Sequence, residues 1–388
     1  MQGGEARCGK LNIAMLGHKR IPSREGGIEV VVEELSTRMA AMGHDVTCFN
    51  RSGNHVGGKE FNMDMGAEYR GVRLRRVPTV ERKGLAAVTS SFFASLYSAV
   101  GKFDVVHIHA EGPAVFCWLP KLFGKKVCVS IHGLDHLRAK WKGKIGARYI
   151  RLGEKMAVRH ADEIIVLGRD VQKYFEEAYG RRTRLIPNGA SRPAFAPPEL
   201  IQERFGLDRD SYILYLGRIV PEKGGHYLVR AFRDVDTKKK LVIAGGASDS
   251  AEYLAGLKTL AEGDGRVIFT GFVQGRVLEE LYSNAYIYCL PSDLEGMPLS
   301  LLEAMGYGNC CLTSDIPECV EAVGDKAVVF RKSDVGDLRE KLQWLCDNPQ
   351  AAAGYKEKAP SAPCREYGWD EVAESTLGVY RGLHEGIG

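Results

Sequence analysis

No stretch of this sequence has the length and hydrophobicity of a membrane-spanning helix. No apolar run reaches about 18 residues, the length that a helix needs to cross a bilayer. The N-terminus also lacks the apolar core of a signal peptide. We therefore expect a cytoplasmic chain that neither crosses a membrane nor leaves the cell by a standard signal.

Cysteine pairs with the spacing of a metal or redox motif are missing as well. The chain has ten cysteines, and none of them forms a Cys-x-x-Cys pattern. In apolar segments a thiol behaves as a small hydrophobic side chain. Four cysteines lie in such segments: Cys48, Cys117, Cys128 and Cys289. The sequence predicts no zinc site and no disulfide framework, which fits a reducing compartment.

A strong excess of one charge is also absent. Lys and Arg number 53 and Asp and Glu number 49, so the net charge is only +4 over 388 residues. This balance does not favour nucleic acid as a partner, and no base-reading motif appears. The dinucleotide fingerprint Gly-x-Gly-x-x-Gly is missing too, which disfavours a dinucleotide oxidoreductase.

What is present is a regular alternation of apolar runs and amphipathic segments. Strands that alternate with helices form parallel sheets, because each helix returns the chain to the start of the next strand. In the first half we expect strands at 11–16, 45–50, 72–77, 105–109, 126–131 and 164–167. In the second half we expect them at 212–216, 241–244, 267–270, 285–290, 310–313 and 327–330.

Two such series in one chain predict two Rossmann-like, doubly wound α/β domains that face each other across a cleft. The length also favours two domains. We place the first domain at 1–193 and the second at 194–364, because 194–198 has the composition of a linker. The remaining tail, 365–388, has the apolar spacing of an amphipathic helix.

The first strand is followed by a long loop, Gly17–Gly27, that carries glycines and three cations, and then by a helix. Gly26 and Gly27 lack side chains and would let the backbone approach a ligand closely. Glu29 suits the positive end of the helix. A flexible loop with a helix cap is the alternative interpretation.

A second glycine-rich turn follows the strand at 212–216. It contains Gly217, Arg218 and Lys223, and two further glycines precede the next helix. Two cations and several backbone amides at a strand-to-helix junction form a cradle for phosphate. A surface turn with ordinary charges is the alternative.

An acidic turn follows the strand at 285–290. Glu295 lies in this turn, and Glu303 lies two turns inside it, on the helix that follows. Backbone amides at the helix N-terminus lack helical partners and point into the same space: Gly296, Met297 and Leu299. Carboxylates accept hydrogen bonds from hydroxyls and amides donate to oxygens, so the pattern suits a polyol that carries a phosphate. A capped helix with two solvated glutamates is the alternative.

Together, the stretches 218–223 and 295–303 resemble the motifs of the retaining glycosyltransferase family 4, which has the GT-B fold. The N-terminal stretch 17–29 is similar to a bacterial branch that builds capsular and other surface polysaccharides. The resemblance covers nearly the whole chain. It implies a transferase that takes a sugar from a nucleotide-diphosphate donor and passes it to a saccharide or polyprenyl-linked acceptor.

The resemblance also gives each residue of the two turns a role. Arg218 and Lys223 would stabilise the charge that bond cleavage leaves on the diphosphate. Glu295 would hold hydroxyls of the donor sugar, and Glu303 would accept from the ribose. Because cations, glycine amides and helix N-termini already face the diphosphate, we expect no metal and no cofactor in the reaction.

Two expectations from the resemblance concern the first domain. His132 follows the strand at 126–131 and would contact the donor sugar or its phosphate, at the edge where doubly wound sheets bind ligands. A loop histidine bonded to Asp135 is the alternative. The tail helix would cross back to the first domain, where a plain cap on the second domain is the alternative.

Two other functions stay open. A nucleotide-sugar 2-epimerase shares this architecture and needs no acceptor, although the cationic loop Gly17–Gly27 argues for one. An inactive nucleotide-sugar-binding protein is the other, and the intact residues Arg218, Lys223, Glu295 and Glu303 argue against it.

The stretch Arg138–Arg151 contains six basic residues, no acidic one and several interleaved apolar residues. It is either a solvated helix face or an interfacial helix on anionic lipid. The second interpretation would make the protein peripheral on the inner face of the plasma membrane.

Two further patterns imitate metal sites. His107 and His109 share one face of their strand, but no third ligand is placed nearby, so we expect histidines of the core or of a cleft edge. Asp234-Val235-Asp236 resembles the metal motif of the other large glycosyltransferase fold. Because it follows a helix instead of a strand, we expect a surface turn.

Overall fold

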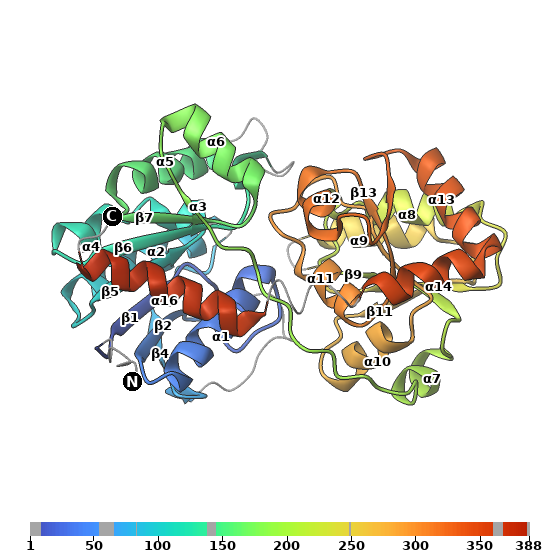
Figure 1. Ribbon diagram of the computed structural model, residues 1–388, viewed down its shortest axis with the longest axis horizontal. Helices are drawn as coiled ribbons and strands as arrows, with labels where there is room; N and C mark the ends of the chain where they lie inside the picture. Colours follow the sequence, from blue (N-terminus) through green and yellow to red (C-terminus); the bar gives the residue numbers. More distant parts are fainter. Residues whose placement is uncertain are drawn as a thin grey trace, which may run out of the picture. The chain divides into compact units, whose positions relative to one another are not determined.

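The computed structural model describes residues 9–53, 66–82, 84–137, 145–247, 250–359 and 368–385 (Figure 1). The chain forms two compact units. The first consists of Met1–Pro187 and Asp370–Gly388, and the second of Asn188–Trp369. The sequence placed the limits after residues 193 and 364, whereas the units divide after Pro187 and Trp369. Nowhere in the described residues is a helix long and apolar enough to cross a membrane.

The first unit carries an eight-stranded sheet in the order β3-β4-β2-β1-β5-β6-β7-β8, in which the described pairs are parallel except for β3 against β4. Its strands are β1 (Asn12–Leu16), β2 (Asp45–Arg51), β3 (Glu68–Tyr69), β4 (Val72–Val77), β5 (Val105–His109), β6 (Lys126–Ile131), β7 (Glu163–Val166) and β8 (Arg184–Leu185). Its helices are α1 (Gly27–Ala41), α2 (Leu85–Val100), α3 (Glu111–Ala114), α4 (Trp118–Leu122), the 3₁₀ turn η2 (Asp135–Leu137), α5 (Ile145–His160), α6 (Arg169–Tyr179) and the terminal α16 (Trp369–Glu385).

The second unit carries a six-stranded parallel sheet in the order β11-β10-β9-β12-β13-β14. Its strands are β9 (Tyr212–Leu216), β10 (Lys240–Ala244), β11 (Val267–Gly271), β12 (Ile287–Leu290), β13 (Cys310–Ser314) and β14 (Val328–Phe330). Its helices are α7 (Leu200–Phe205), the 3₁₀ turn η4 (Pro221–Lys223), α8 (Gly225–Arg233), α9 (Ala251–Leu260), α10 (Arg276–Asn284), α11 (Leu299–Gly306), α12 (Pro317–Val323), α13 (Val335–Asp347) and α14 (Pro349–Lys358).

The central strands are apolar on both faces because helices cover both sides of each sheet. In β9, Ile213 and Tyr215 enter one buried cluster while Tyr212 and Leu214 enter the cluster on the opposite face. This explains why continuous apolar runs located the strands. The expected strands differ from the observed ones by no more than two residues at either end. The four cysteines predicted to be buried are buried free thiols.

The terminal helix α16 packs within the first unit (Figure 1). Tyr380 is wholly buried, and its hydroxyl lies 2.6 Å from Nδ1 of His107 on β5. At the start of the helix, Asp370 accepts a hydrogen bond from Nε of Arg38 on α1 at 2.7 Å. The tail is therefore tied to both a core strand and a surface helix of the sheet that the N-terminal half builds.

The hydrogen bond between the Tyr380 hydroxyl and His107 should contribute measurably to the stability of the protein. Tyr380→Phe leaves the buried Nδ1 of His107 without its partner, which costs about 1–3 kcal/mol. We expect calorimetry to show a melting temperature about 2–10 °C lower. The matched control is Tyr97→Phe, a half-buried ring on α2 whose hydroxyl makes no hydrogen bond within the described part of the chain. Equal melting temperatures for Tyr380→Phe and the wild type would contradict the role of this hydroxyl.

Candidate functional site

The sheet of the second unit brings the two predicted turns together. β9 and β12 are neighbours, although β10 and β11 lie between them in the sequence. The connections from this point run toward opposite edges of the sheet, and doubly wound sheets bind ligands at the carboxyl ends of the strands there. The turn after β9 carries Arg218 and Lys223, and the turn after β12 carries Glu295.

The two turns touch through their backbones. The Glu222 carbonyl accepts a hydrogen bond from the Asp293 amide at 2.9 Å. Gly224 has a φ of +67°, and a Cβ at this position would lie 1.8 Å from the Pro291 carbonyl oxygen. No side chain fits there. Gly224 therefore serves the close packing of one turn on the other, which sets the position of Lys223.

Lys223 and Glu295 form an ion pair in which the carboxylate is buried and the lysine is half-buried. Nζ of Lys223 lies 2.5 Å from Oε1 and 2.6 Å from Oε2 of Glu295. Ser292 Oγ donates a second hydrogen bond to Oε1 at 2.6 Å, and Glu295 is only 8% exposed. Sequence reasoning singled out both charged residues but not their pairing or Ser292. The pair holds both side chains in place, because either charge alone would be costly to bury.

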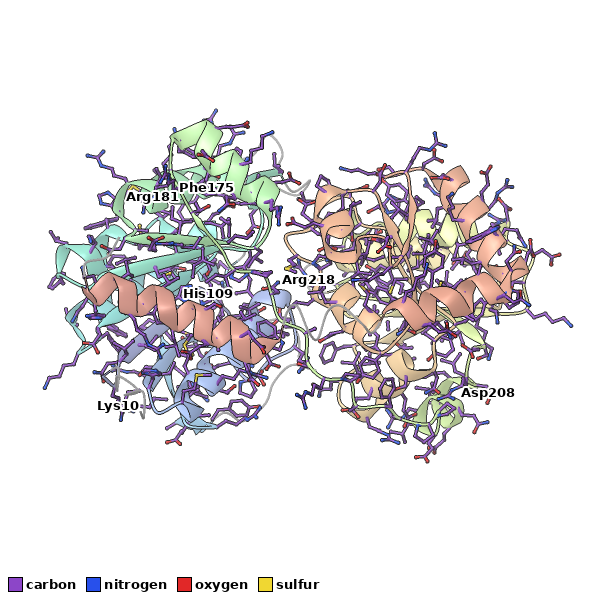
Figure 2. The ribbon with its side chains drawn as sticks, viewed as in Figure 1. Lys10, His109, Phe175, Arg181, Asp208 and Arg218 are labelled. Carbon is purple, nitrogen blue, oxygen red and sulfur yellow. The ribbon has the colours of Figure 1, made fainter. Side chains whose placement is uncertain are left out.

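Arg218 differs from Lys223 in having no carboxylate partner among the described residues. It is half-buried and directly follows β9 (Figure 2). Its guanidinium makes no hydrogen bond or ion pair to another described residue, whereas its carbonyl accepts from the Tyr215 hydroxyl at 3.0 Å. The backbone is thus fixed while the cationic group stays available to an anion.

Unpaired backbone donors lie at the start of α11. Within the described residues, the amides of Gly296, Met297 and Leu299 donate to no acceptor. Their positions are fixed, since Asn188 Nδ2 donates to the Met297 carbonyl at 3.3 Å and its own amide approaches the Met297 sulfur at 3.0 Å. The region therefore offers fixed amide donors beside a cation.

Glu303 lies half-buried on α11 and accepts a hydrogen bond from the Tyr282 hydroxyl at 3.1 Å. Burial, and then the nearby Glu303 carboxylate, raise the pKa of Tyr282 far above its ordinary value, so the phenol keeps its proton and donates. Tyr282 orients the carboxylate. No sequence pattern predicted this contact, because Tyr282 occupies an apolar position of an ordinary amphipathic helix.

In the first unit, His132 directly follows β6 and is half-buried. Its Nε2 lies 3.0 Å from Nδ1 of His109 (Figure 2 labels His109). The rings of His107 and His109 lie 4.1 Å apart, and both side chains are wholly buried, as predicted for core histidines. Burial lowers the pKa of His107 to about 3 and that of His109 well below its ordinary value. His132 is thus supported by neutral imidazoles.

The loop after β1 is held by its own polar contacts. Gly26 caps α1, and a Cβ there would meet the Glu29 carboxylate at 2.7 Å. Glu29 in turn accepts from the Lys19 amide at 2.9 Å, and Lys19 forms an ion pair with Glu25. Gly27 is the first residue of the helix. The cations expected to meet a ligand are partly engaged with neighbouring carboxylates.

Asn50, at the end of β2, fixes the middle of the same loop. Its Oδ1 accepts from the Ile21 amide at 3.1 Å and from His18 Nε2 at 2.9 Å, while its Nδ2 donates to the Ile21 carbonyl at 3.0 Å. Burial lowers the pKa of His18 to about 4. His18 is therefore neutral and carries its proton on Nε2.

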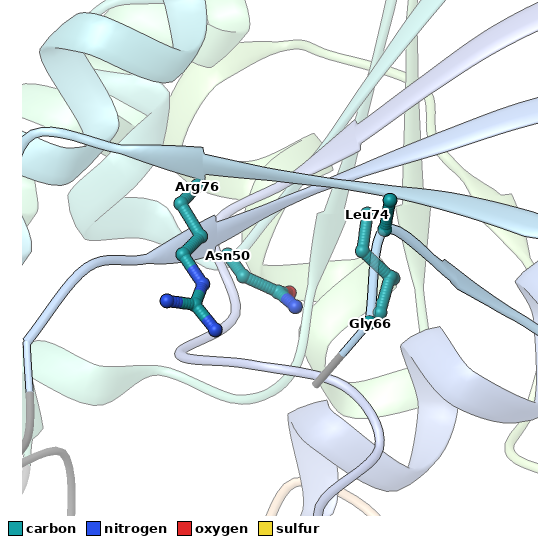
Figure 3. A pocket seen from close by; sticks show the side chains of 5 residues that line it. Asn50, Gly66, Leu74 and Arg76 are labelled. Atoms are coloured by element: carbon teal, nitrogen blue, oxygen red, sulfur yellow. The ribbon is translucent and has the colours of Figure 1, made fainter. Parts of the chain in front are cut away.

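A pocket of about 250 Å³ adjoins Asn50. It is lined by Asn50, Gly66, Ala67, Leu74 and Arg76. Figure 3 shows the Arg76 guanidinium and the Asn50 amide projecting to the same side of their strands. An amide and a cation at a pocket of this size suit a small polar or anionic ligand. Sequence reasoning located the strand of Arg76 but not the pocket.

Two other sequence patterns remain to be placed. Asp234-Val235-Asp236 lies in the turn between α8 and β10, with both aspartates exposed and Val235 buried, as predicted for a surface turn. Of the basic stretch Arg138–Arg151, residues 138–144 lie outside the described residues. The rest belongs to α5, which begins at Ile145.

Comparisons with known proteins match both halves of the chain to sugar-transferring families. Residues 25–191 match the model of Glycosyltransferase Family 4, and residues 199–362 match that of Glycosyl transferases group 1. A D-inositol 3-phosphate glycosyltransferase of Xylanimonas cellulosilytica is 28% identical over 397 residues, which span 92% of this chain and 91% of that protein.

Two solved structures share the architecture over nearly the whole length. Sucrose-phosphate synthase from Thermosynechococcus elongatus superposes with a TM-score of 0.83 at 22% identity, covering 97% of this chain and 100% of the other. Anabaena Alr3699/HepE in complex with UDP-glucose superposes with a TM-score of 0.76 at 15% identity, covering 95% and 99%.

The close contact between the two turns predicts that replacing Gly224 lowers the stability of the second unit strongly. Gly224→Ala should destabilise the second unit by more than the ~1–2 kcal/mol of a left-handed alanine, because the methyl collides with Pro291 backbone. Gly206→Ala is the matched control, since Gly206 has a φ of +60° and its nearest atom is the flexible Lys240 Nζ at 3.4 Å. Thermal unfolding of both variants is the measurement. Equal losses of melting temperature would show that the turns do not depend on this contact.

Proposed function

We propose a reaction for this chain, which is a glycosyltransferase of the GT-B fold built from a family 4 domain and a group 1 domain. The reaction transfers a sugar from a nucleotide-diphosphate sugar to a hydroxyl of a saccharide or lipid-linked saccharide. The observation that carries it is the contact of two turns at the β9–β12 junction, which places Lys223 on Glu295. Cations, amide donors and a carboxylate are the groups that a sugar diphosphate requires.

Arg218 and the amides at the start of α11 are proposed to receive the diphosphate. Their support is that they have no partners among the described residues, yet are held in place by the turns that carry them. A fixed, unpaired donor needs no reorganisation when charge develops on the leaving group. It therefore stabilises the transition state more than a mobile side chain does. Gly217 carries the chain from β9 to Arg218.

The Lys223–Glu295 pair is proposed to couple the sugar to its leaving group. An ammonium has three donors, and two of them are used by Glu295. The third would reach a diphosphate oxygen. The carboxylate keeps lone pairs for hydroxyls of the donor sugar. Glu303, oriented by Tyr282, would accept from the ribose.

The bond from the anomeric carbon to the diphosphate breaks as the acceptor oxygen forms its bond on the same face of the sugar. The acceptor proton passes to the departing diphosphate. Arg218 and Lys223 offset the negative charge that develops there. This retaining course uses no metal and no cofactor. It also fits the lack of a nucleophile poised by a general base at the two turns.

The first unit is proposed to supply the acceptor side. Names of two similar proteins, D-inositol 3-phosphate glycosyltransferase and sucrose-phosphate synthase, contain a phosphorylated compound. Arg76 beside the Asn50 pocket would suit an acceptor that carries an anionic group. Contact of His132, Gly26 and Gly27 with the donor follows from the resemblance.

Two parts of the proposal rest on the sequence alone. Surface polysaccharide synthesis rests on the stretch 17–29. Peripheral contact with an anionic membrane rests on the cations of 138–151, of which 138–144 are not described. A nucleotide-sugar 2-epimerase of the same fold is the competing activity, and it would release nucleotide without an acceptor.

Arg218 gives the clearest test, because no side chain among the described residues depends on its guanidinium for a hydrogen bond or ion pair. Arg218→Ala should slow turnover at saturating donor by roughly 30- to 1,000-fold, since one charge-assisted contact to the transition state contributes about 2–4 kcal/mol. A thermal-shift panel of nucleotide sugars first identifies the donor, and release of nucleoside diphosphate gives the rate. Lys223→Ala should also slow turnover, but it also leaves the buried Glu295 carboxylate without its cation.

The control for this experiment is Arg331→Ala, at an arginine whose side chain is 73% exposed and outside the two turns. It should turn over like the wild type. Wild-type turnover should also persist in excess EDTA. A rate for Arg218→Ala within about threefold of wild type would contradict the proposed role of Arg218 in stabilising the leaving diphosphate. Release of nucleotide that needs no acceptor would favour the epimerase.

Replacing Glu295 and replacing Glu303 should impair different steps, sugar transfer in the first case and nucleotide binding in the second. Glu295→Ala should retain binding of nucleoside diphosphate, because the proposed phosphate and ribose contacts of Arg218 and Glu303 remain. It should transfer about a hundredfold more slowly, since the reacting carbon is misplaced. Glu303→Ala should bind nucleoside diphosphate about 10- to 150-fold more weakly, since a hydrogen bond to a charged acceptor contributes roughly 1.5–3 kcal/mol. Calorimetric affinities and initial rates for both variants are the measurement, and the reverse pattern would exchange the assigned roles.

A further inference from the structure

Three side chains of ligating type meet in the first unit at a place that the proposed reaction does not use. Glu111 comes from α3, His136 from η2 and Glu154 from α5, and all three are buried. One ligand atom of each lies within 4.8 Å of the other two. Nδ1 of His136 is 3.2 Å from Oε2 of Glu154 and 3.9 Å from Oε1 of Glu111.

These three facing atoms lack hydrogen-bond partners among the described residues. Nδ1 of His136 lies within ion-pair distance of both carboxylates, yet no hydrogen bond joins these atoms. More than nine in ten buried polar groups in proteins find a partner. Two carboxylate oxygens and a ring nitrogen left unsatisfied around one point indicate a missing ligand that binds all three.

The outer oxygens of the same carboxylates are firmly held. Oε2 of Glu111 accepts from the Asp135 amide at 2.9 Å. Oε1 of Glu154 accepts from the hydroxyls of Tyr174, at 2.7 Å, and Tyr179. Each carboxylate is thus anchored through one oxygen and presents the other to the centre. Metal-binding carboxylates are oriented in this way by their surroundings.

The backbone is also shaped to bring the cluster together. α5 packs on α3 and on η2, and Figure 1 shows α3, α5 and α6 in the same part of the first unit. A Cβ at Gly153 would lie 1.8 Å from the Glu111 carbonyl oxygen, so only glycine allows the two helices to approach so closely. Glu154 is the next residue. The three ligands are therefore positioned before any ion arrives.

We propose that Oε1 of Glu111, Nδ1 of His136 and Oε2 of Glu154 bind one divalent transition-metal ion, of the Zn²⁺ or Mn²⁺ class. Ligands at about 2.0–2.2 Å from a tetrahedral ion lie roughly 3.3–3.6 Å apart, and the distances of 3.2 and 3.9 Å from Nδ1 of His136 lie on either side of this range. Imidazole suits Zn²⁺ and related ions, while carboxylates suit Mn²⁺ and harder ions, so this mixture selects the borderline metals.

The ion would have a structural role. η2 begins three residues after His132, and the ion would join η2 to α3 and α5. The competing occupant is a proton. Burial raises the pKa of Glu111, and contact with the carboxyl groups of Glu111 and then Glu154 raises the pKa of His136. Without metal, the cluster would hold protons that the ion must displace.

The test begins with wild-type protein stripped by EDTA and desalted. Calorimetric titration with Zn²⁺ and, separately, Mn²⁺ should show one ion per chain, and binding should raise the melting temperature. Anomalous scattering from a Zn²⁺-soaked crystal should give a peak between the three ligand atoms. Absence of stoichiometric binding by the folded chain, or a peak at His107, His109 and His132 instead, would overturn the site and leave a proton-sharing cluster.

Variants then assign the ligands. Glu111→Gln and Glu154→Gln keep the shape of the side chain but remove its charge, and each should weaken binding at least tenfold. Glu280→Gln is the control, at a carboxylate equally buried in the second unit, and its affinity for the ion should be unchanged. Unchanged affinity in both ligand variants overturns the assignment. If the variants do not fold, the crystal peak of the wild type decides.

This site is independent of the donor chemistry. Chelation should lower the melting temperature but spare turnover at temperatures well below unfolding. A chelated enzyme that stays folded but loses turnover would count against the metal-free reaction and not against this site.

Discussion

The hydrogen-bonded ladder between β9 and β12 determines what the second unit can present to a ligand. It is short, pairing Ile287 with Ile213 and Tyr288 with Leu214. Because the two strands are parallel, they end at the same edge of the sheet, and the turns that follow them must share that edge. The backbone contact at Gly224 and the Lys223–Glu295 pair are consequences of this adjacency.

The two units treat their polar loops in different ways. In the first, the loop after β1 engages its charges locally, since Lys19 pairs with Glu25 and the Lys19 amide donates to Glu29. In the second, Arg218 and the amides at the start of α11 stay unpaired within the described residues. Unpaired but fixed donors are costly for stability and useful for binding an anion. This asymmetry favours the second unit as the holder of the diphosphate.

Much of the fold could be predicted from the sequence, because strands covered on both faces are continuous apolar runs. β3 and β8 were missed because each has two residues and no apolar run. Glu295 and Lys223 could be found from their turns, but their pairing depends on strand order, which no local pattern encodes. Glu154 escaped notice because it lies in a helix rich in cations, where a carboxylate is usually a solvated partner.

The side chain of Asn50 shapes the loop that follows β1. Its amide bonds to both the N–H and the carbonyl of Ile21, as the backbone of a neighbouring strand would. The loop between β1 and α1 thus takes its shape from a residue on another strand. Transplanting this loop into a related protein would move its sequence without the side chain that shapes it. A graft would need to move Asn50 with the loop, and the loop alone is not a portable module.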